Sequence, residues 1–302
     1  GREVLLGRLP PRQAAREPCL KAIRHRVLVL GDQLDARSSA LEDFDPARDR
    51  ILMVEAPGEA AHVWSSKPRI AVFLAAMRHF ARDLEARGWP VDYLALGTHS
   101  HATIEAALAD ALARNPPERL VAVEPGEWRL EHSIAQAAAD AGVPLAWRED
   151  RHFLVSRREF ADWARGYRQL RMESFYRRMR KLTGVLMQDG EPAGGAWNFD
   201  ARNRESYGRE GPRDIAAVPH FAPDRITRDA LEAVERHFPG HPGDLAAFAW
   251  PVTREDALDA LEAFVRERLP AFGRHQDAMW TGEETLNHSL LSVAMNLKLL
   301  DP

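Results

Sequence analysis

Residues 27–34 read VLVLGDQL, an apolar run that passes directly into a polar turn. A short continuous apolar run of this kind is typical of a strand buried on both faces of a parallel sheet. Further runs of the same type follow at residues 51–54, 91–96, 120–123 and 143–147. The sequence therefore predicts five buried strands in its first half.

Amphipathic helices are predicted between these strands. In residues 70–87 the apolar side chains follow the i, i+3, i+4, i+7 spacing of a helix with one buried face. Residues 102–112 and 134–141 form two more helical patterns, and Gly142 fits the C-terminal cap of the second. Because strands that alternate with helices form parallel sheets, we expect a doubly wound α/β domain over residues 26–150.

The remainder of the 302 residues is expected to contain a second, helical domain. Residues 1–25 are basic and proline-rich, which predicts a disordered leader. Residues 151–225 begin with a helical pattern at 160–182 and continue as a long loop rich in Gly, Pro and Asn. Residues 226–302 are helical in pattern, with helices expected at residues 231–238, 253–269 and 285–300.

Composition excludes several classes of protein. The chain has 45 acidic and 41 basic residues, and its net charge of −4 does not fit a general nucleic-acid coat protein. No apolar stretch approaches the length of a membrane span. Cys19 is the only cysteine, which excludes an internal disulfide, a thiolate zinc cage and an iron–sulfur cluster within this chain. A reducing compartment is the default expectation.

Polar turns follow three of the predicted strands, where ligands bind in open parallel sheets. They contain Asp32 and Gln33, Glu55, and residues 124–129, whose side chains can hydrogen-bond a planar heterocycle. The glycine fingerprints of dinucleotide and P-loop sites are absent. Two interpretations remain open: a shared pocket, or a helix cap at Asp32 and a solvated Glu124.

Three further motifs each have a functional and a structural interpretation. Lys67 and Arg69, at a helix start, could face an anion or only solvent. Residues 163–181 interleave aromatic and basic side chains, which suits a phosphate backbone or a partly buried aromatic stripe. Residues 286–292 place hydroxyls and a histidine at a helix start, which suits a phosphate or ordinary capping.

Taken together, eight blocks of sequence resemble one family. They are residues 28–34, 67–81, 124–129, 173–180, 183–187, 194–200, 272–279 and 286–291, and they occur in the family's order. The sequence resembles the prokaryotic iron–sulfur branch of the cryptochrome/photolyase family. This branch contains the deoxyribodipyrimidine photolyase-related proteins and includes bacterial (6-4) photolyases. The resemblance covers residues 26–302.

The resemblance implies an α/β antenna domain that binds 6,7-dimethyl-8-ribityllumazine, followed by the beginning of an all-α FAD-binding domain. It also implies light-driven repair of (6-4) or cyclobutane pyrimidine lesions in damaged DNA by electron transfer from reduced FAD. The alternatives are a cryptochrome-like blue-light photoreceptor without repair activity, and a module that only binds lumazine. The resemblance further suggests a monomer in the bacterial cytoplasm that has no membrane partner.

The resemblance assigns binding roles to two groups of residues. The antenna group is Asp32, Gln33, Leu34 and Glu55. The FAD phosphate loop is His288, Ser289, Leu291 and Ser292. Residues 197–199 match a family block to which we assign a structural role, and no catalytic residue or metal site is expected in this stretch.

The sequence also departs from the family pattern. Ser65 and Ser66 replace paired histidines, Arg202 replaces a glutamate, and residues 293–295 replace an aromatic-bearing stretch. The family continues for about another domain, which carries four cysteines for a [4Fe-4S] cluster and most of the FAD pocket. We therefore expect this chain to be an N-terminal portion that lacks repair activity alone.

Overall fold

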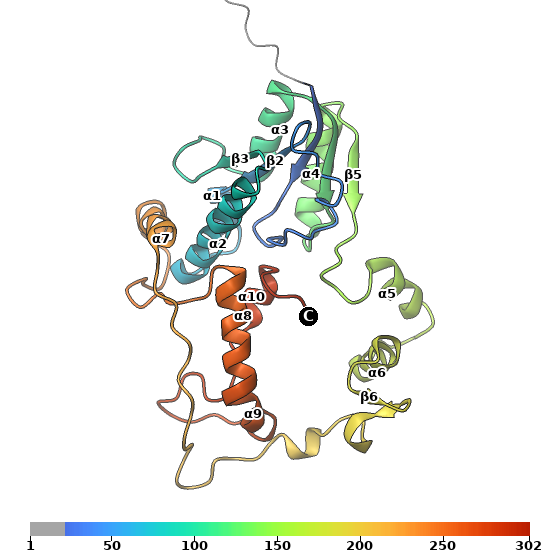
Figure 1. Ribbon diagram of the computed structural model, residues 1–302, viewed down its shortest axis with the longest axis vertical. Helices are drawn as coiled ribbons and strands as arrows, with labels where there is room; N and C mark the ends of the chain where they lie inside the picture. The colour runs from blue at the N-terminus through green and yellow to red at the C-terminus, as the bar shows by residue number, and fades with distance from the viewer. Residues whose placement is uncertain (1–21) are drawn as a thin grey trace, which may run out of the picture.

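The computed structural model describes residues 22–302 (Figure 1). Cys19 and nearly all of the expected leader, residues 1–25, lie outside the described residues. Within the described part, no helix is both long and apolar enough to cross a membrane.

A five-stranded parallel sheet forms the centre of the first half, as the sequence predicts. The strands lie in the order β3-β2-β1-β4-β5. Their bounds are β1 Ile23–Leu28, β2 Arg50–Val54, β3 Val91–Leu94, β4 Pro117–Val123 and β5 Leu145–Arg148. In the register of the central strand, Val27 pairs with Ile51 on one side and with Val121 on the other. The doubly wound α/β fold is confirmed.

Strand β1 begins before the expected boundary at residue 26. Its first four residues include two arginines, Arg24 and Arg26, so this part of the strand is not an apolar run. Both arginines find carboxylates, with Arg24 2.5 Å from Asp49 and Arg26 2.6 Å from the Asp92 carboxylate. These partners lie far away in the sequence, so an apolar run could not indicate this part of the strand.

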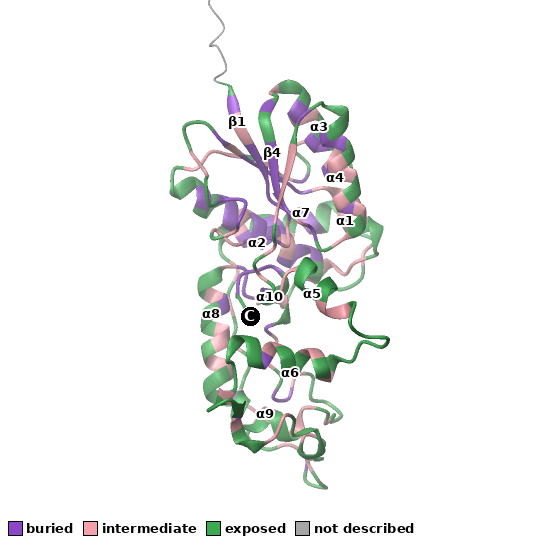
Figure 2. Cartoon of the chain, turned by 90° about the vertical axis from the view of Figure 1, so that its right-hand side faces the viewer, coloured by how far each residue is buried: buried purple, intermediate pink, exposed green. Residues whose placement is uncertain are grey.

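Helices cover both faces of the sheet. Helix α2 (Lys67–Ala86) packs on the face that carries Val27 and Ile51, and α3 (Ile104–Arg114) and α4 (Trp128–Asp140) pack on the opposite face. A short helix that the sequence did not indicate, α1 (Pro57–His62), follows β2. Figure 2 shows that burial is concentrated in the sheet and in α2.

The second half combines helices with long irregular segments (Figure 1). Its elements are α5 Arg157–Ala164, α6 Met172–Thr183, β6 Met187–Gln188, β7 Glu191–Pro192, the 3-10 turns Ala193–Gly195 and Asp200–Arg202, α7 Arg225–His237, α8 Arg254–Ala263, a π-helical segment Phe264–Arg268, α9 Leu269–His275 and α10 Ser292–Asn296. Helix α7 packs against α2, so residues 225–237 extend the core of the α/β domain.

The expected helix over residues 285–300 is wrong. Only Ser292–Asn296 are helical, because Leu286, Leu290 and Lys298 have φ values of 45°, 58° and 61°. Leucines are uncommon in this left-handed region and cannot continue a right-handed helix there. The apolar run instead reflects burial of leucines in the irregular segments on either side of α10, namely Leu286, Leu291, Leu297, Leu299 and Leu300.

The carboxylate of Asp49 should make the fold sensitive to acid. It accepts hydrogen bonds from Arg24 and from the backbone N–H groups of His25 and Asp45. Burial alone would raise the pKa of Asp49, but these hydrogen bonds outweigh it and lower the pKa. The stabilisation is therefore present above the unfolded pKa of about 3.9 and is lost as the pH falls through the lower native value.

We expect Asp49→Asn to lower the free energy of unfolding by about 1–3 kcal/mol at pH 7. Urea unfolding of both proteins at pH 7 and at progressively lower pH should show this difference shrinking below about pH 4. A difference that stays constant into acid would contradict the assignment of the effect to the Asp49 charge.

Candidate functional site

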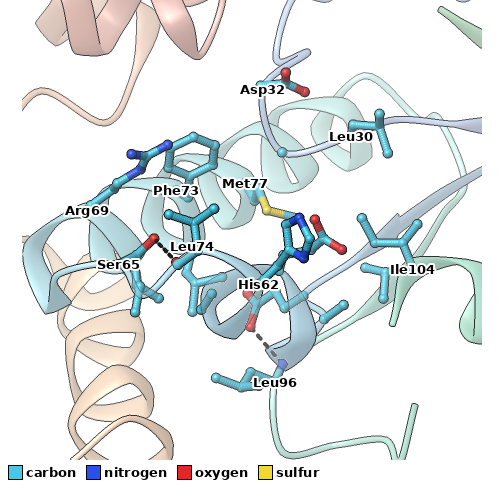
Figure 3. Close-up of a pocket in the computed structure, with 18 of the residues that line it drawn as sticks. Leu30, Asp32, His62, Ser65, Arg69, Phe73, Leu74, Met77, Leu96 and Ile104 are labelled. Carbon is cyan, nitrogen blue, oxygen red and sulfur yellow. Dashed lines mark hydrogen bonds between the residues drawn. The ribbon is translucent and has the colours of Figure 1, made fainter. Parts of the chain in front are cut away.

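A cavity of about 300 Å³ opens at the carboxyl ends of β1 and β2 (Figure 3). Its walls are mainly apolar and come from the turn after β1, the first half of α2 and the start of α3. They include Leu30, Phe73, Leu74, Met77 and Ile104. This is the edge of a parallel sheet where ligands bind, and two opposed apolar walls suit a flat ring.

Gly31 keeps this cavity open. A Cβ atom at this position would lie 3.0 Å from the Met77 sulfur and 3.4 Å from the Phe73 ring. A larger residue would therefore press on both side chains that form one wall of the cavity.

Asp32 supplies a carboxylate at the edge of this cavity. It lies in the turn after β1, and Figure 3 shows it at the same edge as Arg69 and Phe73. Burial raises the pKa of Asp32, and nearby Lys298 only partly offsets the rise. No other residue among residues 22–302 donates a hydrogen bond to the Asp32 carboxylate, so it has capacity to accept one from a ligand. The alternative that Asp32 caps a helix is wrong, because residues 29–49 contain no helix.

Glu55 also lines the cavity, but its carboxylate is fully engaged by the protein. It is 1% exposed and receives hydrogen bonds from Arg78 at 2.7 and 2.9 Å, from the Tyr93 hydroxyl at 2.5 Å and from the Leu96 N–H at 2.7 Å. Burial and the adjacent Glu55 raise the pKa of Tyr93 well above its usual value. The Glu55 carboxylate thus ties α2, β2 and β3 together beneath the cavity.

Gln33 and Leu34 directly follow Asp32 in the sequence, but their side chains do not line the cavity. The buried Gln33 amide nitrogen is 3.4 Å from the Val123 carbonyl oxygen, which it reaches across the end of the sheet. Leu34 is part of the core that α2 covers, and its N–H donates to the Leu297 carbonyl at 3.1 Å. The structure therefore brings only Asp32 and Glu55, of the four antenna residues, to the cavity wall.

A charged rim closes the cavity on the side of α4. Arg129 donates hydrogen bonds to the Glu59 and Glu127 carboxylates at 2.7 Å each, and these bonds raise the pKa of Arg129. The ring of His62 is 3.8 Å from Glu127. Glu124, from the same turn, instead lies 3.7 Å from Arg157 and outside the cavity lining.

Phe73 and Met77 are site residues that sequence reasoning missed, whereas Arg69 was one of its candidates. Phe73 and Met77 belong to the apolar stripe of α2, which indicates burial without separating core from cavity wall. Arg69 lines the cavity, whereas its neighbour Lys67 pairs with Glu235 at 2.5 Å. The helix-start motif did contain the signal, because both basic residues were candidates for an anion.

With this geometry in hand, comparison with known proteins identifies the family. Residues 27–250 match the family of deoxyribodipyrimidine photo-lyase-related proteins. The chain belongs to this family. It is 42% identical over 278 residues to a protein named (6-4) photolyase from Agrobacterium fabrum (strain C58 / ATCC 33970). The matched region is 91% of this chain and 54% of the relative, so this photolyase-related chain spans about half the relative's length.

The expected phosphate loop of this photolyase-related chain is a tight turn before α10. The Ser289 hydroxyl accepts from the Leu291 N–H at 3.3 Å, and Leu291 is buried. Ser292 is exposed at the start of the five-residue helix, and exposed His288 accepts from Arg268 through its carbonyl. None of these residues lines the cavity beside Asp32 or the one that adjoins it. These residues alone therefore do not enclose a flavin.

The part of the photolyase-related chain that the structure describes offers no metal centre. Among residues 22–302, no group of three or more His, Cys, Asp or Glu side chains is placed to hold a metal ion. This stretch also contains no cysteine. No residue of this chain is therefore assigned to an iron–sulfur cluster.

The aromatic and the basic side chains of residues 163–181 make different contacts. Trp163 and Phe175 pack together, with ring centroids 4.8 Å apart. Arg177, Arg180 and Lys181 each lie 5.4 Å from the centre of the Trp197 ring. The aromatic side chains thus join α5 to α6, while the three cations hold Trp197, from the block at residues 197–199, against α6.

Proposed function

We propose that residues 22–150 form the antenna domain of a light-driven DNA photolyase, with 6,7-dimethyl-8-ribityllumazine bound in the cavity beside Asp32. The observation that carries this proposal is the cavity itself, which has a volume of about 300 Å³, mainly apolar walls and the partly buried Asp32 carboxylate at its edge. Membership of the photolyase-related family supports the same function.

The cavity residues would bind and orient the ring and exclude water from it. Phe73, Met77 and Ile104 would contact the ring through dispersion, and the Asp32 carboxylate would accept a hydrogen bond from a ring N–H or a hydroxyl. When bound, the lumazine would absorb light and transfer the excitation energy. Glu55 and Arg78 would fix the floor of the site and would not touch the ligand through their charged groups.

The whole protein would repair (6-4) or cyclobutane pyrimidine lesions in damaged DNA, with FAD as the electron donor that the resemblance implies. The name of the Agrobacterium relative favours the (6-4) lesion. Residues 286–292 remain the proposed contact for the FAD phosphates. The rest of the FAD site would come from other parts of the whole protein.

Titration of the 302-residue chain with purified 6,7-dimethyl-8-ribityllumazine tests the antenna assignment. We expect saturable 1:1 binding, seen as a shift in lumazine absorbance and fluorescence. Absence of saturable binding up to about 1 mM lumazine would contradict the assignment. It would mean that the binding free energy is weaker than about −4 kcal/mol.

The activity is tested on a longer chain that spans the full length of the relative. Repair of lesion-bearing DNA under light and not in the dark supports the photolyase assignment. Light absorption by bound flavin without repair would favour a photoreceptor, and lumazine binding without flavin would favour a binding module.

A further inference from the structure

A shallow hollow of about 520 Å³ opens between the end of α5 and the outer side of α6. It is lined by residues from the stretches 163–167 and 174–182, and we call it the α5–α6 hollow. It shares no lining residue with the cavity beside Asp32. Figure 2 shows α5 and α6 as largely exposed helices, so this surface is open to solvent in the described chain.

Two aromatic rings line the α5–α6 hollow. Trp163 and Tyr167 lie with their ring centroids 4.9 Å apart, and Trp163 is held on its other contact by Phe175 of α6. Tyr167 is 50% exposed. A ring that is held by packing and still half exposed is suited to stack on a flat, unpaired base.

Three cations, Arg177, Arg178 and Lys181, also line the α5–α6 hollow. Arg177 donates to the Glu173 carboxylate at 2.8 Å, but the Arg178 guanidinium forms no hydrogen bond or ion pair within residues 22–302. No acidic residue of the described chain belongs to the lining. The hollow is therefore positively charged.

The charge of the surrounding segment has the same sign. Residues 151–181 contain ten basic and three acidic residues, although the whole chain has a net charge of −4. The three carboxylates, Glu159, Asp162 and Glu173, are each bonded to a neighbour within the same segment. Most of its cations thus have no carboxylate partner in the segment, and the positive charge of this surface is local.

We propose that the α5–α6 hollow binds single-stranded nucleic acid, without reading its sequence and without requiring a lesion. Arg178 and Lys181 would contact phosphates, and Tyr167 would stack on an unpaired base. A duplex keeps its base faces covered, and an acidic peptide supplies no ring at each charge, so neither uses both features of the hollow. This inference goes beyond the proposed function, because it needs no lumazine, flavin or light.

Fluorescence anisotropy of a labelled, undamaged thymidine strand of about 20 nucleotides tests the proposal. The 302-residue chain is titrated in the dark without lumazine or flavin. We expect saturable binding that weakens with salt. The logarithm of the affinity should fall by about 2 for each tenfold rise in salt, which corresponds to about three phosphate contacts on a single strand.

The double variant Arg178→Gln with Lys181→Gln tests the phosphate contacts. We expect weaker binding and a salt slope of about 1 or less, because two of about three phosphate contacts are lost. The double variant Arg82→Gln with Arg114→Gln is the matched control. It removes the same charge from two exposed arginines that pair with carboxylates on α2 and α3, and it should bind as the unaltered chain does.

Tyr167→Ala tests the stacking contact. We expect it to weaken binding of the thymidine strand about tenfold and to leave binding of an abasic strand of the same length unchanged. Tyr167→Phe should bind the thymidine strand as the unaltered chain does, because the ring and not the hydroxyl makes the contact. An equal loss for the abasic strand would overturn the stacking role.

Three further outcomes would overturn the proposal: no saturable binding at low salt, an equal loss in the two double variants, or competition by polyglutamate as effective as that by the unlabelled strand. A uridine strand of the same length distinguishes DNA from RNA. Binding of either strand supports the proposal, and the ratio of their affinities identifies the preferred one. Because no lumazine is present, these results are independent of the antenna titration.

Discussion

Replacing Glu55 by alanine is expected to lower the free energy of unfolding by about 3–5 kcal/mol. The change leaves the Arg78 guanidinium, only 15% exposed, without a partner and removes the acceptor for the Tyr93 hydroxyl and the Leu96 N–H. A buried charge without its partner loses solvation that nothing replaces. Urea unfolding followed by circular dichroism measures the loss.

Glu85→Ala is the control for this change. Its carboxylate lies 3.2 Å from Arg82 on the same helix, but both side chains are exposed, and the expected loss is under about 1 kcal/mol. The double variant Glu55→Leu with Arg78→Met should recover part of the Glu55→Ala loss, because no charge then stays buried. A Glu55→Ala loss as small as that of Glu85→Ala would show that the buried network contributes little.

The role of Glu55 could not be predicted from the sequence alone. An acidic residue directly after a buried strand is the same signal whether its carboxylate faces a ligand or a buried arginine. The partners that decide between these possibilities are Arg78 and Tyr93, which lie 23 and 38 residues further along the chain. Asp32 gave the same signal and does face the cavity, so only the folded structure separates the two carboxylates.

The fold was more predictable than the site because a buried strand can be identified from consecutive apolar residues in its own short stretch of sequence. The runs at residues 51–54 and 120–123 are apolar on consecutive positions, since both faces of the sheet are covered. The run from Leu286 to Leu300 is equally apolar, but there the leucines reach the core through turns with positive φ. A run of apolar residues predicts that they are buried, but it does not predict the backbone conformation of the segment.

Replacing Asp32 by asparagine should weaken binding of 6,7-dimethyl-8-ribityllumazine by about 10- to 100-fold, because a hydrogen bond to a charged acceptor contributes about 1.5–3 kcal/mol. The same change should not lower the free energy of unfolding of the unliganded chain. Burial raises the pKa of Asp32, so its ionised form destabilises the folded state as the pH rises above the unfolded value. Asparagine removes that penalty and keeps the shape.

The pH dependence gives Asp32 an independent signature. In the unaltered protein, lumazine affinity should fall as the pH drops through the raised pKa of Asp32, because protonation removes the charged acceptor. The Asp32→Asn protein should lack this dependence. Asp43→Asn, an exposed position in the same connection between β1 and β2, is the control and should bind like the unaltered chain. Unfolding of Asp32→Asn, or unchanged affinity in a folded protein, would instead assign Asp32 to the structure of the turn.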